Sequence, residues 1–502
     1  MFLKIRELHF LAGRPVAILN EDSAKELNVN INERITLKKA NFNKGIIAII
    51  DIAKGLIEKD EIALSVEIIN QLKLKKGDIV EVGAAQKPLS VNYILKKLNG
   101  KELSYTELYS IISDIVNNNL SEAEIAYFVS GIYLRKMTLQ ETTDLTKAIV
   151  QVGKKLQFND KRMVLDKHSI GGLAGNRTTP IVVSIIAAAI EKYKLRAIMP
   201  KTSSRAITSA AGTADVIETI ANVEFSLTQI KEILNRTHAC LVWGGALGLA
   251  PADDKIIQVE RLLSLDPESQ LIASILAKKI SVGATHILID IPCGKSSKVS
   301  PNEARILKHK FESVGKKLNL NLKILITRGE EPIGNGIGPL LELLDVLSVL
   351  NRDKNRPLDL EKKSLLLATE LLSMLNIDKE KARQICINLL ESKQAFYWFQ
   401  KIIEAQGGNF KNLGKKLALA KYKETIYSNA QGKVEEISSK KLANISRLAG
   451  SPENKKAGIY LHIHVGDLVR KKQSLFDIYS ESKEKLNYAI EVAEHSGVIK
   501  IR

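Results

Sequence analysis

The expected fold of this chain rests on one stretch, Val164-Leu-Asp-Lys-His-Ser-Ile-Gly-Gly-Leu-Ala-Gly-Asn-Arg-Thr-Thr-Pro180. Its order of apolar, glycine-rich and hydroxyl-bearing residues predicts a short strand, then a loop, then the start of a helix. Thr179 suits the cap of that helix, and Pro180 suits its first turn, where a backbone N–H is not needed. Repeated strand–loop–helix units of this kind are typical of an α/β domain with a parallel sheet.

The loop in this stretch has the composition of an anion site. Three glycines let the backbone come close to a ligand, and Lys167 adds a positive charge. Ser169, Thr178 and Thr179 add hydroxyl groups beside a helix N-terminus, which attracts anions. We expect the anion to be phosphate. His168 is either a structural histidine or a group that transfers a proton or contacts the substrate.

Length and charge limit the classes of protein to consider. The chain has 502 residues, 45% of them hydrophobic, so we expect more than one domain, each with its own core. The formal net charge of +18 favours anionic ligands, such as phosphate, a nucleotide or nucleic acid. Aromatic residues make up only 5%, and the sequence has no run of five or more Lys and Arg. Both facts disfavour a nucleic-acid partner.

The three cysteines, Cys240, Cys293 and Cys386, are far apart and form no CxxC motif. This spacing predicts neither a zinc site nor a disulfide framework, and it fits a reducing compartment. The first ten residues are too charged for a signal peptide, and the longest apolar run, at 181–190, is too short to span a bilayer. We therefore expect a cytoplasmic protein with no metal and no membrane partner.

The pattern along the chain divides it into four parts. We expect a β-barrel-like module at 1–86, a helical domain at 87–160, an α/β domain at 161–425 and a C-terminal α+β domain at 426–502. Part of 225–240 is a further candidate to pack on the helical domain. Serines begin two of the expected helices, at Ser104 and Ser121. The expected parallel strands lie at 163–165, 197–199, 239–243, 286–291 and 322–327.

A second polar loop follows the second expected strand, at 200–213, and it contains several hydroxyl groups, a lysine and an arginine. Taken alone it is better explained as a polar loop with a helix cap. Loops after successive parallel strands, however, open on the same carboxyl edge of the sheet. The two loops could therefore surround one phosphate.

The third candidate element is a helix that begins near Asp266, where Asp266 suits the N-cap and Pro267 the first turn. Ser274 and Lys278 are four residues apart and so share one face, which Gln270 continues. This stripe is either a solvent-exposed face or a wall that donates hydrogen bonds to a base or a sugar.

A fourth loop, at 289–298, resembles a phosphate-binding P-loop only superficially. That motif needs a glycine five residues before Gly294, where this chain has Ile289. Lys295 and Lys298 remain available for an anion. The glycines at 334–338 predict a turn, and the alternating pair at 462 and 464 is expected to pack or lie on the surface.

Several of these motifs together resemble the thymidine/pyrimidine nucleoside phosphorylase family. They are Asp166-Lys-His-Ser-Ile-Gly-Gly, Ser204-Arg-Ala-Ile-Thr-Ser-Ala-Ala-Gly-Thr-Ala-Asp, Leu249-Ala-Pro-Ala-Asp-Asp and Ala273-Ser-Ile-Leu-Ala-Lys-Lys. The N-terminal β module fits the long branch of the family, which holds bacterial proteins assigned as thymidine phosphorylases and archaeal AMP phosphorylases. Residues 457–469 also resemble the closing domain of the family.

The resemblance implies phosphorolysis of an N-glycosidic bond, with inorganic phosphate as co-substrate and no other cofactor. It implies that phosphate is bound by Lys167, Ser169, Ser203 and Thr213, with Thr179 as a further candidate. It assigns Asp266 as the proton donor, and Ser274 and Lys278 to the base. The nucleoside or nucleotide contacts it implies are Gly172, Ser204, Arg205, Thr208, Ser209, Ser274 and Lys298. It also implies a homodimer, or a larger homo-oligomer.

This sequence differs from the pyrimidine-specific members of the family at two places, and both differences bear on which nucleobase is bound. Pyrimidine-specific relatives have an arginine seven residues before the aspartate matched by Asp266, and here Val259 takes that place, with Arg261 two residues on. The phosphate loop is also one residue longer, and both features are shared with the AMP-cleaving branch. We expect thymidine as substrate, giving thymine and 2-deoxyribose 1-phosphate. The rivals are AMP phosphorolysis, giving adenine and ribose 1,5-bisphosphate, and a non-catalytic basic nucleotide-binding protein.

Overall fold

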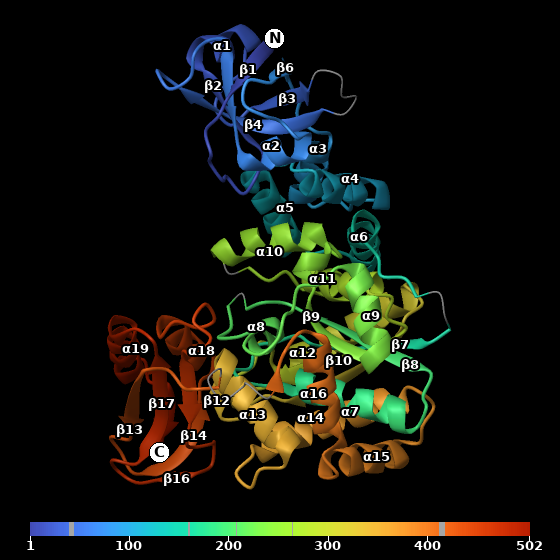
Figure 1. Ribbon diagram of the computed structural model, residues 1–502, viewed down its shortest axis with the longest axis vertical. Coiled ribbons are helices and arrows are strands. Elements are labelled where there is room, and N and C mark those ends of the chain that lie inside the picture. The colour runs from blue at the N-terminus through green and yellow to red at the C-terminus, as the bar shows by residue number, and fades with distance from the viewer. Residues whose placement is uncertain (40–44, 159–160, 207, 264, 411–416) are drawn as a thin grey trace. The chain divides into compact units, whose positions relative to one another are not determined.

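The computed structural model describes residues 1–39, 45–158, 161–206, 208–263, 265–410 and 417–502, which Figure 1 traces. The side chains of Arg261 and Leu263 lie outside this description. The backbone divides into two units, one made of Met1–Val152 with Pro251–Ala273 and the other of Gly153–Ala250 with Ser274–Arg502. The last of the three boundaries along the chain, between Ala273 and Ser274, falls inside helix α11 (Glu268–Ser281).

The first unit begins with a closed barrel of six strands in the order β1-β5-β2-β4-β3-β6. Alternate side chains point inward, and residues such as Leu37, Ile50 and Ile62 are fully buried. Closure leaves no strand edge open to another chain. The elements are β1 (Phe2–Arg6), β2 (Val16–Asn20), α1 (Glu21–Leu27), β3 (Arg34–Lys39), β4 (Ile46–Ala53), β5 (Glu61–Leu64), α2 (Val66–Leu72) and β6 (Ile79–Ala84).

Helices complete the first unit. Ser104 and Ser121 both form capping boxes, with Glu107 and Glu124, so the two serine caps expected from the sequence are confirmed. Arg34 of the barrel pairs with Glu124, which ties the barrel to the helices. The helices are α3 (Ser90–Leu98), α4 (Tyr105–Val116), α5 (Glu122–Arg135), α6 (Leu139–Val152) and α10 (Pro251–Leu263), and α10 packs on α4, α5 and α6.

The second unit is built on a five-stranded sheet in the order β11-β10-β7-β8-β9, in which every pair of neighbours is parallel. The strands are β7 (Met163–Ser169), β8 (Ala197–Ser203), β9 (Ala239–Trp243), β10 (His286–Cys293) and β11 (Asn321–Arg328). They are mostly buried apolar runs, as expected for a parallel sheet covered by helices. The mixed α/β class expected from the sequence is therefore confirmed.

Helix α7 (Thr178–Lys192) is buried along almost its whole length, which explains why its sequence is apolar on every side. It packs on β8, β9 and the later helices α14 (Leu358–Ser373), α15 (Lys379–Glu391) and α16 (Gln394–Ala405). The remaining elements of this part are α8 (Thr213–Glu218), α9 (Leu227–Thr237), the 3-10 turn η1 (Gly245–Leu247), α12 (Pro301–Lys317), β12 (Gly336–Ile337) and α13 (Pro339–Asn351).

The last part of the chain, 417–502, forms two small sheets with two helices. The glycine-rich segment 334–338, expected to be only a turn, contributes β12 to the first of these sheets, because β12 pairs with β15. The elements are β13 (Tyr422–Tyr427), β14 (Gly432–Ile437), α18 (Ser439–Leu448), β15 (Gly458–Leu461), β16 (Leu468–Val469), β17 (Ser474–Ser480), α19 (Lys483–His495) and β18 (Ile499–Ile501).

Three local expectations differ from the structure. Helix α7 begins at Thr178 with Arg177 at the N-cap, so Thr179 lies within the helix and does not cap it. Helix α11 begins at Glu268, so both Asp266 and Pro267 precede it. The part of the later chain that joins the helices of the first unit is 251–273, whereas α9, which covers much of 225–240, packs on β8, β9 and α16.

The described helices include none that is both long and apolar enough to cross a bilayer. Within the same residues, no group of three or more His, Cys, Asp and Glu side chains is placed to share a metal ion.

Candidate functional site

The first polar loop begins where β7 ends and runs into α7, so it lies at the carboxyl edge of the sheet. Lys167, near the end of β7, is only 2% exposed. Its Nζ donates to the hydroxyl oxygens of Thr178, at 2.7 Å, and Thr179, at 3.3 Å. Three of the residues singled out in the sequence therefore meet, and their common feature is a buried ammonium group surrounded by hydroxyls.

Two glycines fix the path of this loop. Gly172 has a φ of +91°, and a Cβ on it would lie 2.5 Å from the Cβ of Lys298. Gly175 has a φ of +66°, and its Cβ would lie 2.2 Å from the carbonyl oxygen of Ile333. Only glycine fits these two close approaches. Gly172 and Lys298, both expected to contact the nucleoside, are thus brought side by side.

Arg177 connects the first loop to the second. Its guanidinium donates to the Thr213 hydroxyl at 2.7 Å, to the carbonyl oxygen of Ala211 at 2.8 Å and to Glu342 at 2.7 Å. Thr213 is thereby held next to the first loop, as the expectation of one shared phosphate requires. Sequence reasoning missed Arg177, although an arginine between a glycine-rich loop and a helix start was a usable signal.

Several buried aspartate and lysine side chains lie close to Lys167. Asp166 pairs with Lys279, 2.9 Å from Nζ to Oδ2, and with Lys201, 3.4 Å from Nζ to Oδ1. On the neighbouring strand β10, Asp290 pairs with Lys363 at 3.1 Å. With Lys167 these residues form what we call the lysine cluster, which consists of Asp166, Lys167, Lys201, Lys279, Asp290 and Lys363.

The lysine cluster contains four lysines and two aspartates, all nearly inaccessible to solvent. Burial lowers the pKa of Lys167 to about 7 and the pKa of Lys279 to about 7, because no equal number of anions offsets the loss of hydration. A dianion at this position would supply the missing negative charge. Sequence reasoning singled out only Lys167 as a ligand-binding residue here, because apart from its neighbour Asp166 the other members are far apart in the chain, on β8, α11, β10 and α14.

Ser169 and Ser203 are the last residues of β7 and β8, and their hydroxyl groups differ in hydrogen bonding. The Ser169 hydroxyl is buried and has no hydrogen-bond partner among the described residues. The Ser203 hydroxyl donates to the carbonyl oxygen of Val242 at 3.2 Å. The Ser169 oxygen is therefore free to bind a ligand, and the Ser203 oxygen already has a partner.

His168 lies on β7 between Lys167 and Ser169. Burial lowers its pKa well below the usual value, and the positive charges of Lys279 and Lys201 add to this shift. The imidazole is therefore neutral at physiological pH, so it can accept a hydrogen bond but is not a charged acid.

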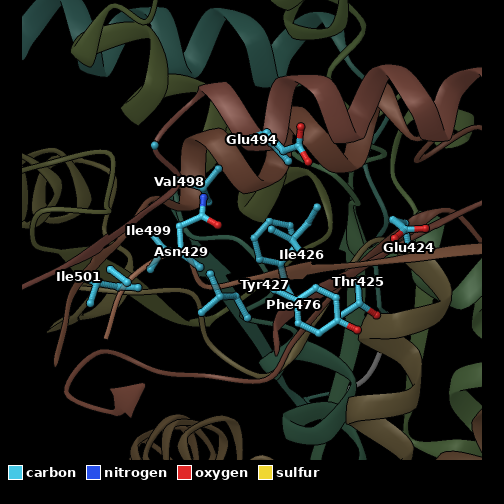
Figure 2. Close-up of a pocket in the computed structure, with 14 residues that line it drawn as sticks. Glu424, Thr425, Ile426, Tyr427, Asn429, Phe476, Glu494, Val498, Ile499 and Ile501 are labelled. Atoms are coloured by element: carbon cyan, nitrogen blue, oxygen red, sulfur yellow. The ribbon is translucent and has the colours of Figure 1, made fainter. Parts of the chain in front are cut away.

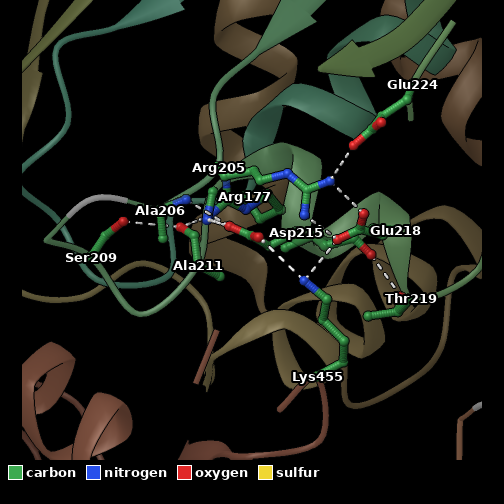
Figure 3. Close-up of polar contacts among 12 residues, drawn as sticks. Arg177, Arg205, Ala206, Ser209, Ala211, Asp215, Glu218, Thr219, Glu224 and Lys455 are labelled. Atoms are coloured by element: carbon green, nitrogen blue, oxygen red, sulfur yellow. Dashed lines mark hydrogen bonds and ion pairs between the residues drawn. The ribbon is translucent and has the colours of Figure 1, made fainter. Parts of the chain in front are cut away.

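The second loop carries most of the residues expected to contact the nucleoside, and it is tied to a second charged group (Figure 3). Arg205 makes a two-point contact with Glu218, at 2.7 and 2.9 Å, and a third contact with Glu224 at 2.8 Å. Its guanidinium also lies 4.6 Å from the centre of the Trp243 ring. We call Arg205, Asp215, Glu218, Glu224 and Lys455 the carboxylate cluster.

Three other residues of this set have simpler surroundings. Ser209 donates to the carbonyl oxygen of Ala211 at 3.2 Å, and the carbonyl oxygen of Ser204 accepts from the amide of Ala214 at 3.4 Å. Thr208 is exposed. The structure thus places Arg205 in an ion-paired cluster and leaves Thr208 open to solvent.

Ser274 and Lys278 share one face of α11, as their spacing predicts, and Lys278 Nζ donates to Ser274 Oγ at 3.3 Å. Both belong to the second unit. Asp266 and Val259 belong to the first unit, where Asp266 is exposed and Val259 is buried. The expected residues are thus divided between the two units.

A pocket of about 700 Å³ lies away from these loops, in the C-terminal part (Figure 2). Strands β13, β17 and β18 and the end of α19 line it, with side chains such as Tyr427, Phe476 and Glu494. None of the residues predicted from the sequence lines this pocket, so it does not bear on the phosphate loops.

Comparison with known proteins shows which family the chain is similar to. A family model described as "Glycosyl transferase family, helical bundle domain" matches residues 91–153, and one described as "Pyrimidine nucleoside phosphorylase C-terminal domain" matches residues 425–500. A relative from Archaeoglobus fulgidus named "AMP phosphorylase 1" is 40% identical over 98% of this chain and 96% of its own length. A relative from Legionella pneumophila (strain Paris) named "Putative thymidine phosphorylase" is 42% identical over 89% of this chain and 85% of its own.

Among solved structures, the anthranilate phosphoribosyltransferase of Thermus thermophilus matches with a TM-score of 0.49 and 16% identity, over 63% of this chain and 99% of that one. The family assignment rests on the two relatives, which cover most of both chains. The chain belongs to the thymidine/pyrimidine nucleoside phosphorylase family, whose members are pentosyltransferases, in the branch that holds the relatives named AMP phosphorylase and putative thymidine phosphorylase.

Proposed function

We propose that this chain cleaves the N-glycosidic bond of thymidine with inorganic phosphate, giving thymine and 2-deoxyribose 1-phosphate. One observation carries the phosphate part of the proposal: Lys167 is a buried ammonium that contacts only hydroxyl groups in the described structure, within a cluster of four lysines and two aspartates. A phosphate dianion matches this shortage of negative charge, and the free hydroxyl of Ser169 is a donor for it.

The chemistry follows from these contacts. An oxygen of the bound phosphate attacks C1′ of the sugar, and the electrons of the C1′–N bond move to the base nitrogen. The sugar becomes positively charged as the bond breaks, so the adjacent phosphate stabilises it. The departing base takes up a proton, and by the family resemblance Asp266 donates it. Lys167, Ser169 and Thr213 hold the phosphate in this proposal, and Thr179 supports Lys167.

Thymidine is the first substrate we propose. It carries no phosphate of its own, so the phosphate co-substrate is the one oxyanion that the site must bind. In the second unit the lysine cluster has an excess of cations. The two cations of the carboxylate cluster, Arg205 and Lys455, are already paired with three carboxylates. This arrangement provides for one oxyanion. The relative named "Putative thymidine phosphorylase" supports the same choice.

AMP is the second candidate, and one contact favours it. The backbone and Cβ of Lys298 are packed directly against Gly172, so the side chain of this lysine starts beside the phosphate loop. The longer loop and Val259 are shared with the AMP-cleaving branch, and the relative named "AMP phosphorylase 1" matches nearly the full chain. This reaction would give adenine and ribose 1,5-bisphosphate.

A substrate panel tests the proposal. The purified chain is incubated with phosphate and, separately, with thymidine, uridine, AMP or CMP, and free base is measured by chromatography. Release of thymine from thymidine is the expected result, and release of adenine from AMP alone supports the second candidate. Release of no base from any of them would leave a protein that binds nucleotides without cleaving them.

Replacing Asp266 tests its role as proton donor. We expect Asp266→Asn to lower kcat about 100-fold or more, with a much smaller change in KM, because an amide cannot donate the proton. Glu122→Gln, in the first turn of another helix of the same unit, is the matched control. An unchanged kcat for Asp266→Asn would reduce Asp266 to a structural residue.

A further inference from the structure

The second polar loop is held in place from its far side by the C-terminal part of the chain. Asp215, in the first turn of α8, accepts hydrogen bonds from the amides of Ala206, at 2.7 Å, and Gly212, at 2.8 Å. One Asp215 oxygen thus binds both amides and ties Ala206 to Gly212. The other Asp215 oxygen lies 3.3 Å from Nζ of Lys455.

Lys455 also reaches the group that holds Arg205. Its Nζ lies 2.9 Å from Glu218, the carboxylate that makes the two-point contact with Arg205. Burial alone would raise the pKa of Glu218, but the hydrogen bond from Lys455 helps to lower it, so Glu218 stays charged. Figure 3 shows Lys455 between Asp215 and Glu218, with Arg205 on the other side of Glu218.

The charge balance shows why Lys455 is needed. The carboxylate cluster has three carboxylates and two cations, so it lacks positive charge even with Lys455 present. Without Lys455, Asp215 and Glu218 would repel each other across less than one turn of α8. Both carboxylates would then compete for Arg205, and the hydrogen bonds of Asp215 to the two amides would loosen.

The position of Lys455 is itself well fixed. It follows α18, and its carbonyl oxygen accepts a hydrogen bond from the amide of Leu340 at 2.9 Å, at the start of α13. The lysine therefore cannot drift away from α8 without disturbing the backbone of the C-terminal part. Its side chain is 29% exposed, so substitution there does not empty a core.

We propose that Lys455 is a positioning residue for the nucleoside-binding loop: through Asp215 and Glu218 it holds Ala206 and Gly212 in place and sets the direction of the Arg205 side chain. This inference rests on the proposed function, because it assigns that loop to the nucleoside. It gives the C-terminal part of the chain a role in substrate binding, in addition to any role in folding.

The test compares Lys455→Met with Lys456→Met, a neighbouring lysine for which the described part of the chain shows no side-chain ion pair. We expect Lys455→Met to raise KM for the nucleoside about tenfold while kcat changes less than twofold, and Lys455→Arg to restore most of the loss. We expect Lys456→Met to behave like the unmodified enzyme. Equal KM values for all of these proteins would overturn the proposal.

A second readout does not depend on activity. Hydrogen exchange of the peptide containing Ala206 and Gly212 should be faster in Lys455→Met than in Lys456→Met, because both amides donate to Asp215. Unchanged exchange in this peptide contradicts the proposal even if the substrate is not the one proposed. Faster exchange with no activity on any nucleoside would instead refute the proposed function alone.

Glu218→Gln provides an independent variant, in case Lys455→Met does not fold. If Lys455 acts through Glu218, this variant also raises the nucleoside KM, and the double variant raises it by less than the product of the two single effects. Fully multiplicative effects would show that Lys455 and Glu218 act separately, which contradicts the proposal.

Discussion

The lysine cluster and the carboxylate cluster lie beside successive loops at one sheet edge, and they differ in charge balance. The first has four buried lysines for two aspartates, and the second has three carboxylates for two cations. In the second, each cation has a carboxylate partner within 3.3 Å, whereas the polar contacts of Lys167 Nζ within the described ranges are all with hydroxyl groups. A cluster that lacks anions is suited to bind one, and a cluster whose cations are all paired is suited to hold a loop.

The same comparison shows that two basic residues from the family motifs have different surroundings in the structure. Lys167 and Arg205 both lie in motifs of the family, and both are expected to contact ligands. Because Arg205 is already held by Glu218 and Glu224, it can serve the substrate only in a direction that those carboxylates allow. Lys167 has no such constraint, and its Nζ remains available to a ligand.

The largest effect should come from removing the cation that lacks an anionic partner. We expect Lys167→Met to lower kcat/KM for phosphate on the order of 1,000-fold, because a buried charged contact to the dianion is lost. Initial rates at varied phosphate measure this, with Lys192→Met at the other end of α7 as control. If the variant saturates at the same phosphate concentration as the unmodified enzyme, Lys167 does not bind phosphate.

Removing an anion from the lysine cluster should reduce stability. We expect Asp166→Asn to destabilise the second unit by about 3 kcal/mol, because Lys201 and Lys279 lose their buried counter-charge. Thermal unfolding measures the loss, and sulfate should raise the melting temperature of the variant more than that of the unmodified protein. Equal melting temperatures with and without the substitution would contradict the proposed role of Asp166.

The pH dependence of anion binding should reveal the lysine cluster as well. The pKa of Lys167 and that of Lys279 are lowered to about 7 from 10.5, so in the ligand-free protein both lose their proton as pH rises above 7. The unfolded chain binds more protons between pH 7 and 10.5, so these lysines make the ligand-free protein more stable as pH rises. Anion binding needs the protons back and therefore weakens over the same range.

Sulfate is the suitable probe, because it does not titrate in this range. We expect its dissociation constant to rise about tenfold per pH unit above about pH 7.5 for each lysine that must take up a proton. Calorimetry from about pH 7 to about pH 9 measures the slope, and Lys279→Met should reduce it. A dissociation constant independent of pH would mean that the lysines are fully charged without a ligand.

The smallest effect should come from the exposed end of the carboxylate cluster. Glu224 is half-exposed and is the second carboxylate on Arg205, so Glu224→Gln should change the nucleoside KM less than twofold and stability by less than about 1 kcal/mol. Steady-state kinetics beside Glu218→Gln would check this. A larger loss for Glu224→Gln than for Glu218→Gln would reverse the order of importance that the contacts indicate.

The sequence predicted some features of the site and missed others for a physical reason. Lys167, Thr178 and Thr179 lie within one stretch, and the structure brings them together. Lys201, Lys279 and Lys363 belong to three different elements, and nothing in the sequence groups them with one another. Lys201 is on β8, Lys279 on α11 and Lys363 on α14, and they meet only because the fold brings these elements to Asp166 and Asp290, so no local rule could have found them.

Some errors came from competition between local rules. Threonine is a residue type that often caps helices, but Arg177 and not Thr179 is the N-cap of α7. The hydroxyl groups of Thr178 and Thr179 accept hydrogen bonds from Lys167. The glycines at 334–338 are typical of a turn, but β12 forms there because β15 supplies a strand to pair with. In the second case a distant strand decided between two locally acceptable conformations.

By itself, the sequence determined the mixed α/β class, the places of the five parallel strands, the serine caps of two helices and the membership of the family. These depend on patterns of apolar, capping and motif residues that are close together in the sequence, so they can be recognised without the fold. The tertiary structure alone decided which lysines share Asp166, that the Ser169 hydroxyl finds no partner among the residues the structure describes, and that Lys455 reaches Asp215 from 240 residues away. Charge balance in a buried site depends on which distant side chains meet, and only folding establishes that.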